Sequence, residues 1–293
     1  GKSMTAGLDV DLFGTLSGSD PNTTLVLAGA GNRLNLHDAS VSVAIVLAKD
    51  GQRHSISGKG VFVGCDVSAD SGSSIVLDAH LTLVDGNLRP SSGEIALASG
   101  STIVYRGTSA RPISPLRYWN LSVEGNSGAF LTGPTTVCGV SSLNAGTLTT
   151  GAYSLFLEPE AVLQEIGLAS VIGRVMTTRL PRRGIKESFG NIGLDILVSD
   201  DAQDSITVSR VSGTALVIRG GAAIAKYFDL SCRGKLLQST LILHYAPHDL
   251  RGQAESRLRL LRSTDGGASW SNEGASANLS EQTLSYSGPV SDS

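Results

Sequence analysis

Charged side chains are scarce in this chain, and their scarcity excludes several classes of protein. Asp, Glu, Lys and Arg make up 17% of the 293 residues, against about 25% in an average soluble domain. Because exposed helices depend on residues such as Glu and Lys, a helical bundle is not expected. The formal net charge is −3, and no segment has the clustered Lys and Arg that nucleic-acid binding requires.

Cysteines and long apolar runs are scarce too. The three cysteines, Cys65, Cys138 and Cys232, form no C-x-x-C pair, so neither a zinc site nor a disulfide framework is expected. Cys65 and Cys138 lie in apolar, strand-like segments and are predicted to be small buried side chains, with a Cys65–Cys138 bridge left open. No apolar run approaches the roughly 18 residues that span a membrane, and no signal peptide is visible.

Catalytic motifs are also missing. The sequence has no G-x-S-x-G, H-E-x-x-H, G-x-G-x-x-G or Walker motif, its acidic residues are scattered, and its five histidines do not cluster. We therefore expect no catalytic residues, no cofactor and no enzymatic activity. The alternative is a carbohydrate-binding protein or a polysaccharide lyase or hydrolase built on a β-helix. The metal candidates are three acids in one inter-strand turn, where calcium could bind: Asp200, Asp201 and Asp204.

Glycine and short β-type runs are what the sequence has in quantity. Glycine accounts for 35 residues, and runs of a few apolar or β-branched residues, such as 61–63 and 74–77, are separated by Gly, Ser, Asn and Asp. The best helix candidate, residues 160–167, is short and could equally be a turn. The sequence therefore predicts an all-β fold.

An internal repeat indicates how the first part of the chain is organised. The hexapeptide Leu83–Leu88 (LVDGNL) matches Leu143–Leu148 (LNAGTL) 60 residues later, and apolar positions beyond it match at the same offset. Such a repeat predicts a β-solenoid over residues 1–168, with about three coils of about 20 residues in each repeat. Glycine is expected at the coil corners because it tolerates positive φ. An ordinary β-sandwich is the alternative.

Strand-like runs become longer after residue 168. Alternating apolar and polar residues are clear in 226–230 and 241–245. We therefore predict a second domain, an antiparallel β-sandwich, over residues 169–293. Its expected strands lie in 170–178, 192–199, 205–211, 222–230, 239–245 and 257–262.

Five stretches carry a resemblance to known proteins. They are LNAGTL (143–148), VIGRV (171–175), SFGNIGL (188–194), AKYFDL (225–230) and LLRSTDGGASW (260–270). They resemble a recurrent region of long, repetitive surface proteins secreted by bacteria of the Bacteroidetes and Chlorobi lineage. Many of those proteins carry a C-terminal sorting domain for type IX secretion, which is not seen here. We therefore expect a piece of a longer polypeptide.

The resemblance implies a secreted, extracellular cell-surface protein. Together with the missing catalytic motifs, it predicts a non-catalytic structural or adhesive role, as a stalk, adhesin or filament subunit. The expected partners are further copies of the chain, which would join through solenoid ends or edge strands, or neighbouring domains of a longer chain. Surface glycans are a further expected partner. Nucleic acid and membrane insertion are not expected.

One motif has a clear local physical explanation. Ser263, Asp265, Gly267 and Trp270 fit the pattern S-x-D-x-G-x-x-W, which is that of the Asp-box. Asp265 is expected to accept turn N–H groups, Gly267 to allow an unusual backbone, and Trp270 to pack back over a hairpin. A single copy predicts a structural motif rather than a propeller.

An aromatic pair is a candidate contact site. Tyr118 and Trp119 follow a Pro-containing loop in a chain that is otherwise poor in aromatic residues. Exposed aromatic rings bind glycans or protein partners, and the alternative is a loop packed on the solenoid.

The N-terminal segment is the candidate assembly strand. Leu8, Val10 and Leu12 alternate with Asp9 and Asp11, which predicts a strand with one buried and one acidic face. We expect this strand to pair either with the terminal coil of a neighbouring subunit or with a preceding part of a longer polypeptide.

Overall fold

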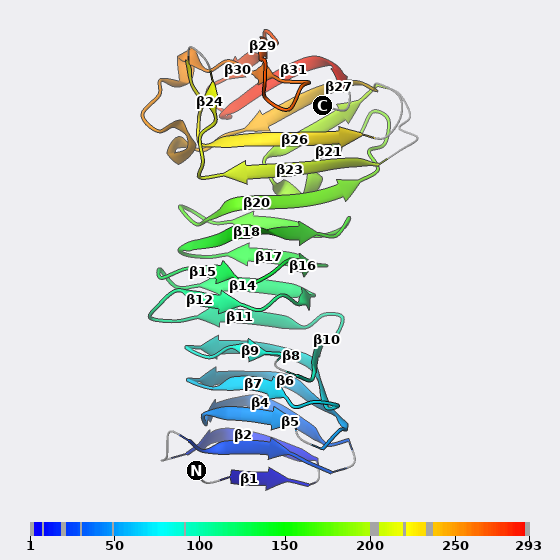
Figure 1. Ribbon diagram of the computed structural model, residues 1–293, viewed down its shortest axis with the longest axis vertical. Helices are drawn as coiled ribbons and strands as arrows, with labels where there is room; N and C mark the ends of the chain where they lie inside the picture. The colour runs from blue at the N-terminus through cyan, green and yellow to red at the C-terminus, as the bar shows by residue number, and fades with distance from the viewer. Residues whose placement is uncertain are drawn as a thin grey trace. The chain divides into compact units, whose positions relative to one another are not determined.

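The protein is all-β, as the sequence predicts (Figure 1). The computed structural model describes residues 3–7, 9–18, 22–29, 31–48, 50–90, 92–199, 205–218, 221–232 and 237–290. Strand makes up 58% and helix 4%. The helix candidate at 160–167 is instead built around a strand, β19 (Val162–Glu165).

The chain folds into two compact units. The solenoid unit comprises residues 1–155 and 164–170, and the C-terminal unit comprises residues 156–163 and 171–293. The boundary expected between residues 168 and 169 lies within the segment 164–170 of the solenoid unit.

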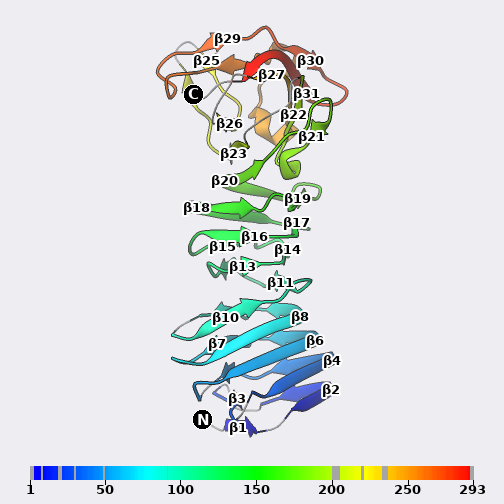
Figure 2. The same cartoon turned by 90° about the vertical axis from the view of Figure 1, so that its right-hand side faces the viewer.

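The solenoid unit is a β-solenoid of about eight turns (Figures 1 and 2). Its first sheet has the strand order β1 (Ser3–Ala6), β3 (Thr24–Leu27), β5 (Ile45–Ala48), β7 (Asp66–Ala69) and β9 (Leu88–Arg89). Its neighbours pair in parallel, as expected when each strand comes from the next coil.

A second sheet runs the length of the solenoid. Its strands are β2 (Val10–Ser17), β4 (Arg33–Ser42), β6 (Arg53–Val63), β8 (Ser74–Val84), β10 (Glu94–Leu97), β11 (Thr102–Arg106), β14 (Asn120–Glu124), β17 (Val140–Leu143) and β19. In the later coils a further set of strands forms the other side: β12 (Arg111–Ile113), β13 (Arg117–Tyr118), β15 (Ala129–Leu131), β16 (Thr135–Val137) and β18 (Thr147–Leu157).

The strand register confirms the repeat found in the sequence. Tyr105 pairs with Leu83 on one side and with Val123 on the other. Val123 in turn pairs with Leu143. Leu83 and Leu143 therefore occupy one column of the stack, three coils apart.

The repeated hexapeptide forms a corner of the coil. Its four leucines have 0% of their surface exposed: Leu83, Leu88, Leu143 and Leu148. Gly146 has the expected positive φ of 70°. Gly86 does not, and the reason for glycine there is different. A Cβ at Gly86 would lie 2.0 Å from the carbonyl oxygen of Cys65 in the preceding coil, so only glycine allows this approach.

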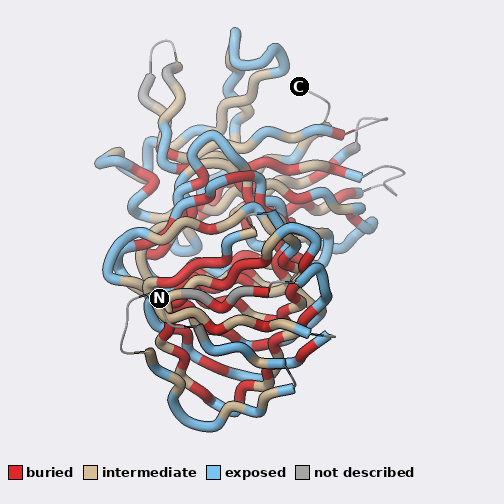
Figure 3. Tube along the Cα trace, turned by 60° about the horizontal axis from the view of Figure 1, so that its bottom comes forward, coloured by how far each residue is buried: buried red, intermediate tan, exposed pale blue. Residues whose placement is uncertain are grey.

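Alternation along the strands places the core inside the coils. In β8 the buried positions are Ile75, Leu77, Ala79, Leu81 and Leu83, and the residues between them are more exposed. Figure 3 shows the same banding along successive strands. A coil covers its apolar residues only with the help of its neighbours, because each coil is one strand thick.

The cysteines belong to the buried residues of the two units. Cys65, Cys138 and Cys232 are all described and buried, and none forms a disulfide, so the Cys65–Cys138 bridge left open by the sequence is absent. Burial raises the pKa of the Cys65 thiol to about 12. Cys65 and Cys138 are therefore small buried side chains, as predicted.

The C-terminal unit consists of antiparallel strands. One set contains β20 (Ser170–Arg179), β23 (Ile206–Ser212) and β26 (Lys226–Cys232). The other has the order β21 (Lys186–Glu187), β22 (Leu194–Val198), β27 (Leu237–His244), β31 (Thr283–Val290) and β30 (Ser276–Asn278).

The remaining elements of this unit are short. They are the ribbons β24 (Val217–Ile218)–β25 (Gly221–Ala222) and β28 (Leu261–Arg262)–β29 (Ser271–Asn272), and the 3-10 helices η1 (Phe189–Asn191), η2 (Pro247–Leu250) and η3 (Glu255–Arg257). No helix in the described part of the chain is long and apolar enough to cross a membrane.

Candidate interaction site at the first coil

The inward apolar side chains of the first coil are more exposed than the equivalent side chains of the second coil. Val10 and Leu12 of β2 pair with Leu34 and Leu36 of β4. Leu34 and Leu36 are 1% and 2% exposed, whereas Val10 and Leu12 are only partly buried. The four side chains occupy equivalent inward positions, and the difference arises because β2 has a described neighbouring strand on its β4 side only.

The other sheet shows the same loss of cover. Met4 of β1 pairs with Leu25 of β3, yet Met4 is 46% exposed and Leu25 is 4% exposed. In both sheets, therefore, the described apolar side chains of the first coil are more exposed than their partners in the second coil.

The outer backbone edges of the two first-coil strands, β1 and β2, also lack a described partner. β1 ends the first sheet and β2 ends the second, with β3 and β4 as their respective partners. Both strands lie at the N-terminal end of the solenoid in Figure 1. No strand in the described ranges covers their outer edges, which leaves two rows of N–H and C=O groups available for pairing.

The outward face of β2 is acidic, as the sequence predicts. Asp9 and Asp11 are exposed. The Asn35 amide donates to Asp11 Oδ1 at 3.0 Å, and His37 Nε2 lies 3.1 Å from the same oxygen. These hydrogen bonds, chiefly the one to His37, lower the pKa of Asp11. Within the chain, then, the carboxylate already has partners on its β4 side.

Phe13 is an exposed aromatic residue that sequence analysis missed. It is 71% exposed, and its ring stacks on His37 with centroids 4.2 Å apart. The sequence pattern could have predicted this exposure, because Phe13 continues the alternation that places Asp9 and Asp11 on the outward face. A large apolar side chain at an outward position next to an open edge favours a contact with another molecule.

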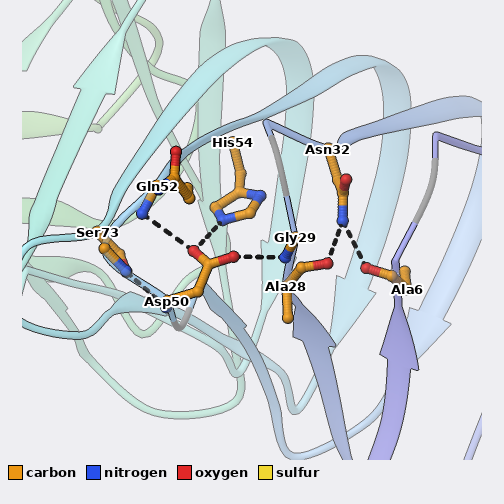
Figure 4. A network of polar contacts seen from close by, with 9 residues as sticks. Ala6, Ala28, Gly29, Asn32, Asp50, Gln52, His54 and Ser73 are labelled. Carbon is orange, nitrogen blue, oxygen red and sulfur yellow. Dashed lines mark hydrogen bonds and ion pairs between the residues drawn. The ribbon is translucent and has the colours of Figure 1, made fainter.

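A network of hydrogen bonds fixes the corners of the first coils (Figure 4). Asn32 Nδ2 donates to the carbonyl oxygens of Ala6 and Ala28, both at 2.6 Å. Asp50 accepts from Gln52 N at 3.0 Å and contacts the buried His54 at 3.0 Å. The bond from Asn32 to Ala6 joins the end of β1 to the second coil, so the open coil is held in place.

Four predicted site residues lie outside the described residues. They are Leu8 of the assembly strand and the metal candidates Asp200, Asp201 and Asp204. Among the residues that are described, no group of three or more His, Cys, Asp and Glu side chains could hold a metal ion.

The aromatic pair is not an exposed patch. Tyr118 has 0% of its surface exposed. Its hydroxyl lies 2.9 Å from that of Tyr105 and donates to the Ser114 carbonyl at 3.1 Å. Burial raises the pKa of Tyr118 well above its usual range. The expectation of a Tyr118 contact is therefore wrong, because the ring fills the solenoid core. Trp119 is partly buried.

The hydrogen bonds expected around Asp265 are present. β28 and β29 form a hairpin whose loop is residues 263–270. Asp265 Oδ1 accepts from Ser269 N at 2.9 Å and from Ser263 Oγ at 2.7 Å. Gly267 has a φ of 90°, and the Trp270 indole donates to its carbonyl at 3.1 Å. Every one of these contacts is internal to the hairpin.

A hollow of about 590 Å³ lies in the C-terminal unit, against β20. Arg179 lines it and pairs with Glu187 at 2.7 Å while its side chain is 11% exposed. Arg179 also donates to the carbonyl of Ala161. Arg179 is the last residue of β20, and these two contacts join that strand to Glu187 of β21 and to Ala161, which lies in another segment of the same unit.

Comparison with family models, with curated proteins and with solved structures finds no match. The class of the protein is therefore defined by its own fold: a β-solenoid of about eight turns together with a unit of antiparallel strands.

Proposed function

We propose that this chain is a non-catalytic structural segment of a secreted bacterial surface protein, a stalk or filament element that self-associates through its first coil. One observation carries the proposal. The first coil combines strand edges that have no described partner, on two sheets, with inward apolar side chains that are more exposed than their buried partners in the next coil. The five stretches that resemble secreted surface proteins support the location.

Two favourable contributions would accompany such an association. A strand added to β1 or β2 pairs backbone groups that otherwise face solvent, as in β-augmentation. The same strand covers Met4, Val10 and Leu12, and burying apolar surface contributes about 25 cal/mol per Å². Asn32 already holds the coil to its neighbour, so little further ordering of its backbone opposes the association.

Acidic residues of the solenoid support a non-catalytic role. Asp66, an acid of β7, pairs with Arg89 at 2.6 Å. Its other oxygen accepts from Asn87 N at 2.9 Å. Both contacts link neighbouring coils, so the carboxylate is used in holding the stack together.

We further propose that the C-terminal unit is a β-sandwich made of its two antiparallel sheets. β22 and β23 belong to different sheets, and each carries buried apolar residues, including Ile196 and Val208 at 0% exposure. Arg210 of β23 is 2% exposed, and its guanidinium donates to the carbonyl of Ile192, near the start of β22, at 3.4 Å. These contacts support two sheets that face each other.

Self-association is tested by light scattering and negative-stain imaging of the chain and two matched variants. Met4→Lys places an ammonium on the uncovered end, where a partner would bury it without a counter-charge. Val63→Lys adds the same charge to an outward position of an interior strand, at a comparable exposure of 41%. We expect the parent and Val63→Lys to associate equally, and Met4→Lys to associate at least tenfold more weakly.

Two outcomes would contradict the proposal. One is a parent chain that stays monomeric at high concentration. The other is equal weakening by both lysines, which would show that added charge, rather than cover of the first coil, controls association.

A further inference from the structure

We propose that Lys226 and Asp249 condense to an amide, so that the folded chain carries a covalent cross-link within its C-terminal unit. Lys226 Nζ lies 2.5 Å from Asp249 Oδ2. Lys226 begins β26, and Asp249 lies in η2, which follows β27. The inference goes beyond the proposed self-association and does not depend on it.

Burial distinguishes this pair from an ordinary lysine–aspartate contact. The side chains of Lys226 and Asp249 are 11% and 3% exposed. The pair of Lys186 with Asp195 has a distance of 3.1 Å, but its lysine is 58% exposed. Water can therefore hydrate the ammonium of Lys186, whereas it is largely excluded from that of Lys226.

The surroundings of the pair are apolar. In the chain, Asp249 lies between Tyr245 and Leu250, two members of a buried apolar cluster. Ile224, two residues before Lys226, packs against the same cluster. Taking an ammonium and a carboxylate out of water can cost more than their attraction returns. An amide carries neither charge, so these surroundings favour condensation over a buried ion pair.

Backbone hydrogen bonds hold the two reacting groups together. Ala225 N, next to Lys226, donates to the carbonyl oxygen of Asp249 at 2.8 Å. Ala246 N donates to Asp249 Oδ2, also at 2.8 Å, and so orients the carboxylate. Groups held at contact distance react as if at a very high concentration, which offsets the weak electrophilicity of an unactivated carboxyl.

The condensation balances without a co-reactant. One proton passes from Nζ to the carboxylate, which leaves a neutral amine and a neutral carboxyl. The Nζ lone pair attacks Cγ and forms the C–N bond, while the Ala246 N–H stabilises the charge that develops on Oδ2. Oδ1 leaves as water, with the electron pair of the broken C–O bond and the two protons that Nζ gives up. His248 Nε2 lies 3.7 Å from Oδ1, where it can carry protons to the leaving oxygen.

The cross-link would join the two antiparallel sheets of the unit. β26 and β27 belong to different sheets, and the chain that the amide closes contains both strands. Tension transmitted along the chain would pass through the amide, so residues 227–248 would be shielded from it.

Mass spectrometry of the denatured full chain tests the proposal. We expect the parent to be lighter than its sequence by the mass of one water, and its digest to contain a branched peptide that joins Lys226 to Asp249. Lys226→Arg keeps the positive charge but presents a guanidinium that stays protonated and cannot attack Cγ. This variant should have the full mass of its sequence, whereas the matched control, Lys186→Arg, should still lack one water.

A parent chain of full sequence mass would overturn the proposal and leave Lys226 and Asp249 as a buried ion pair. A missing water that persists in Lys226→Arg would place the modification elsewhere and overturn it as well. Circular dichroism checks that both variants fold. Should Lys226→Arg fail to fold, the branched peptide still decides the question in the parent alone.

Discussion

At the scale of single residues, the tightest constraint on this fold lies where a glycine faces the backbone of the adjacent coil. Gly58 and Gly86 illustrate it: a Cβ at either would lie 2.0 Å from a carbonyl oxygen, of Leu36 and Cys65 respectively. Gly58 also has a positive φ of 86°, whereas Gly86 does not. Close stacking of coils therefore requires glycine even where the local backbone would accept any residue.

Gly86→Ala should destabilise the solenoid. The added methyl group cannot fit against the Cys65 carbonyl without a backbone shift, and overpacking of this kind costs about 1–3 kcal/mol. We expect a lower thermal unfolding midpoint by circular dichroism. Gly7→Ala is the control, because its nearest neighbour, the Ala28 carbonyl oxygen, would lie at an ordinary 3.9 Å. Equal midpoints for the two variants would contradict the role given to Gly86.

At the scale of elements, the hairpin β28–β29 depends on one carboxylate. Asp265 accepts two hydrogen bonds from Ser269 and one from Ser263. These bonds, chiefly the one from the Ser269 hydroxyl, lower the pKa of Asp265 to about 2. The loop of this hairpin is thus held by polar contacts among its own residues.

The loop should keep its structure in moderately acidic solution. Because the folded pKa lies below the usual value of about 3.9, the hydrogen bonds are fully present above pH 4 and are lost as the pH falls through about 2. The indole N–H resonance of Trp270 measures this, since it donates to the Gly267 carbonyl. We expect a transition near pH 2, and a midpoint near pH 4 would refute the assignment. Asp265→Asn, which removes the titration, should abolish the transition.

The elements also show which parts of the structure a sequence can predict. The hexapeptides at 83–88 and 143–148 predicted the coil correctly, since burial with period two and a glycine corner are local patterns. The position of Tyr118 was not predictable, because its side chain meets that of Tyr105, which lies in a strand of a different sheet. Phe13 was missed for a related reason. Phe13 lies at an outward position of β2, and its stacking on His37 of β4 depends on the strand pairing rather than on the segment alone.

At the scale of the whole molecule, the solenoid is a one-dimensional stack in which each coil touches only its neighbours. The strand register defines the length of one coil at this point of the chain. Along β6 and β8, Arg53 pairs with Ser74 and His54 with Ile75, so equivalent positions are 21 residues apart. Removing residues 53–73 would therefore join Gln52 to Ser74 and delete one coil while keeping every inward position inward.

We expect the chain lacking residues 53–73 to fold. Its solenoid should be shorter by the thickness of one coil, about 4.8 Å, with an unchanged β-sheet circular dichroism spectrum. Deleting only residues 53–63 is the contrasting variant, since it removes β6 without completing a coil and puts neighbouring strands out of register. We expect that variant to unfold. Similar spectra for the two deletion variants would contradict a solenoid in which one whole coil is the repeating unit.

The direction of the hydrogen bonds has a mechanical consequence. In the solenoid unit the bonds between parallel strands run along the stacking direction, so tension applied along that direction pulls directly on one ladder after another. The coils would then unfold one at a time rather than all together, because each coil is held only by its neighbours. Each coil of about 20 residues would release about 70 Å of chain. If the chain serves as the proposed stalk, it would lengthen in steps under load and absorb work at every step, so that a sudden pull would not be taken at a single breaking point.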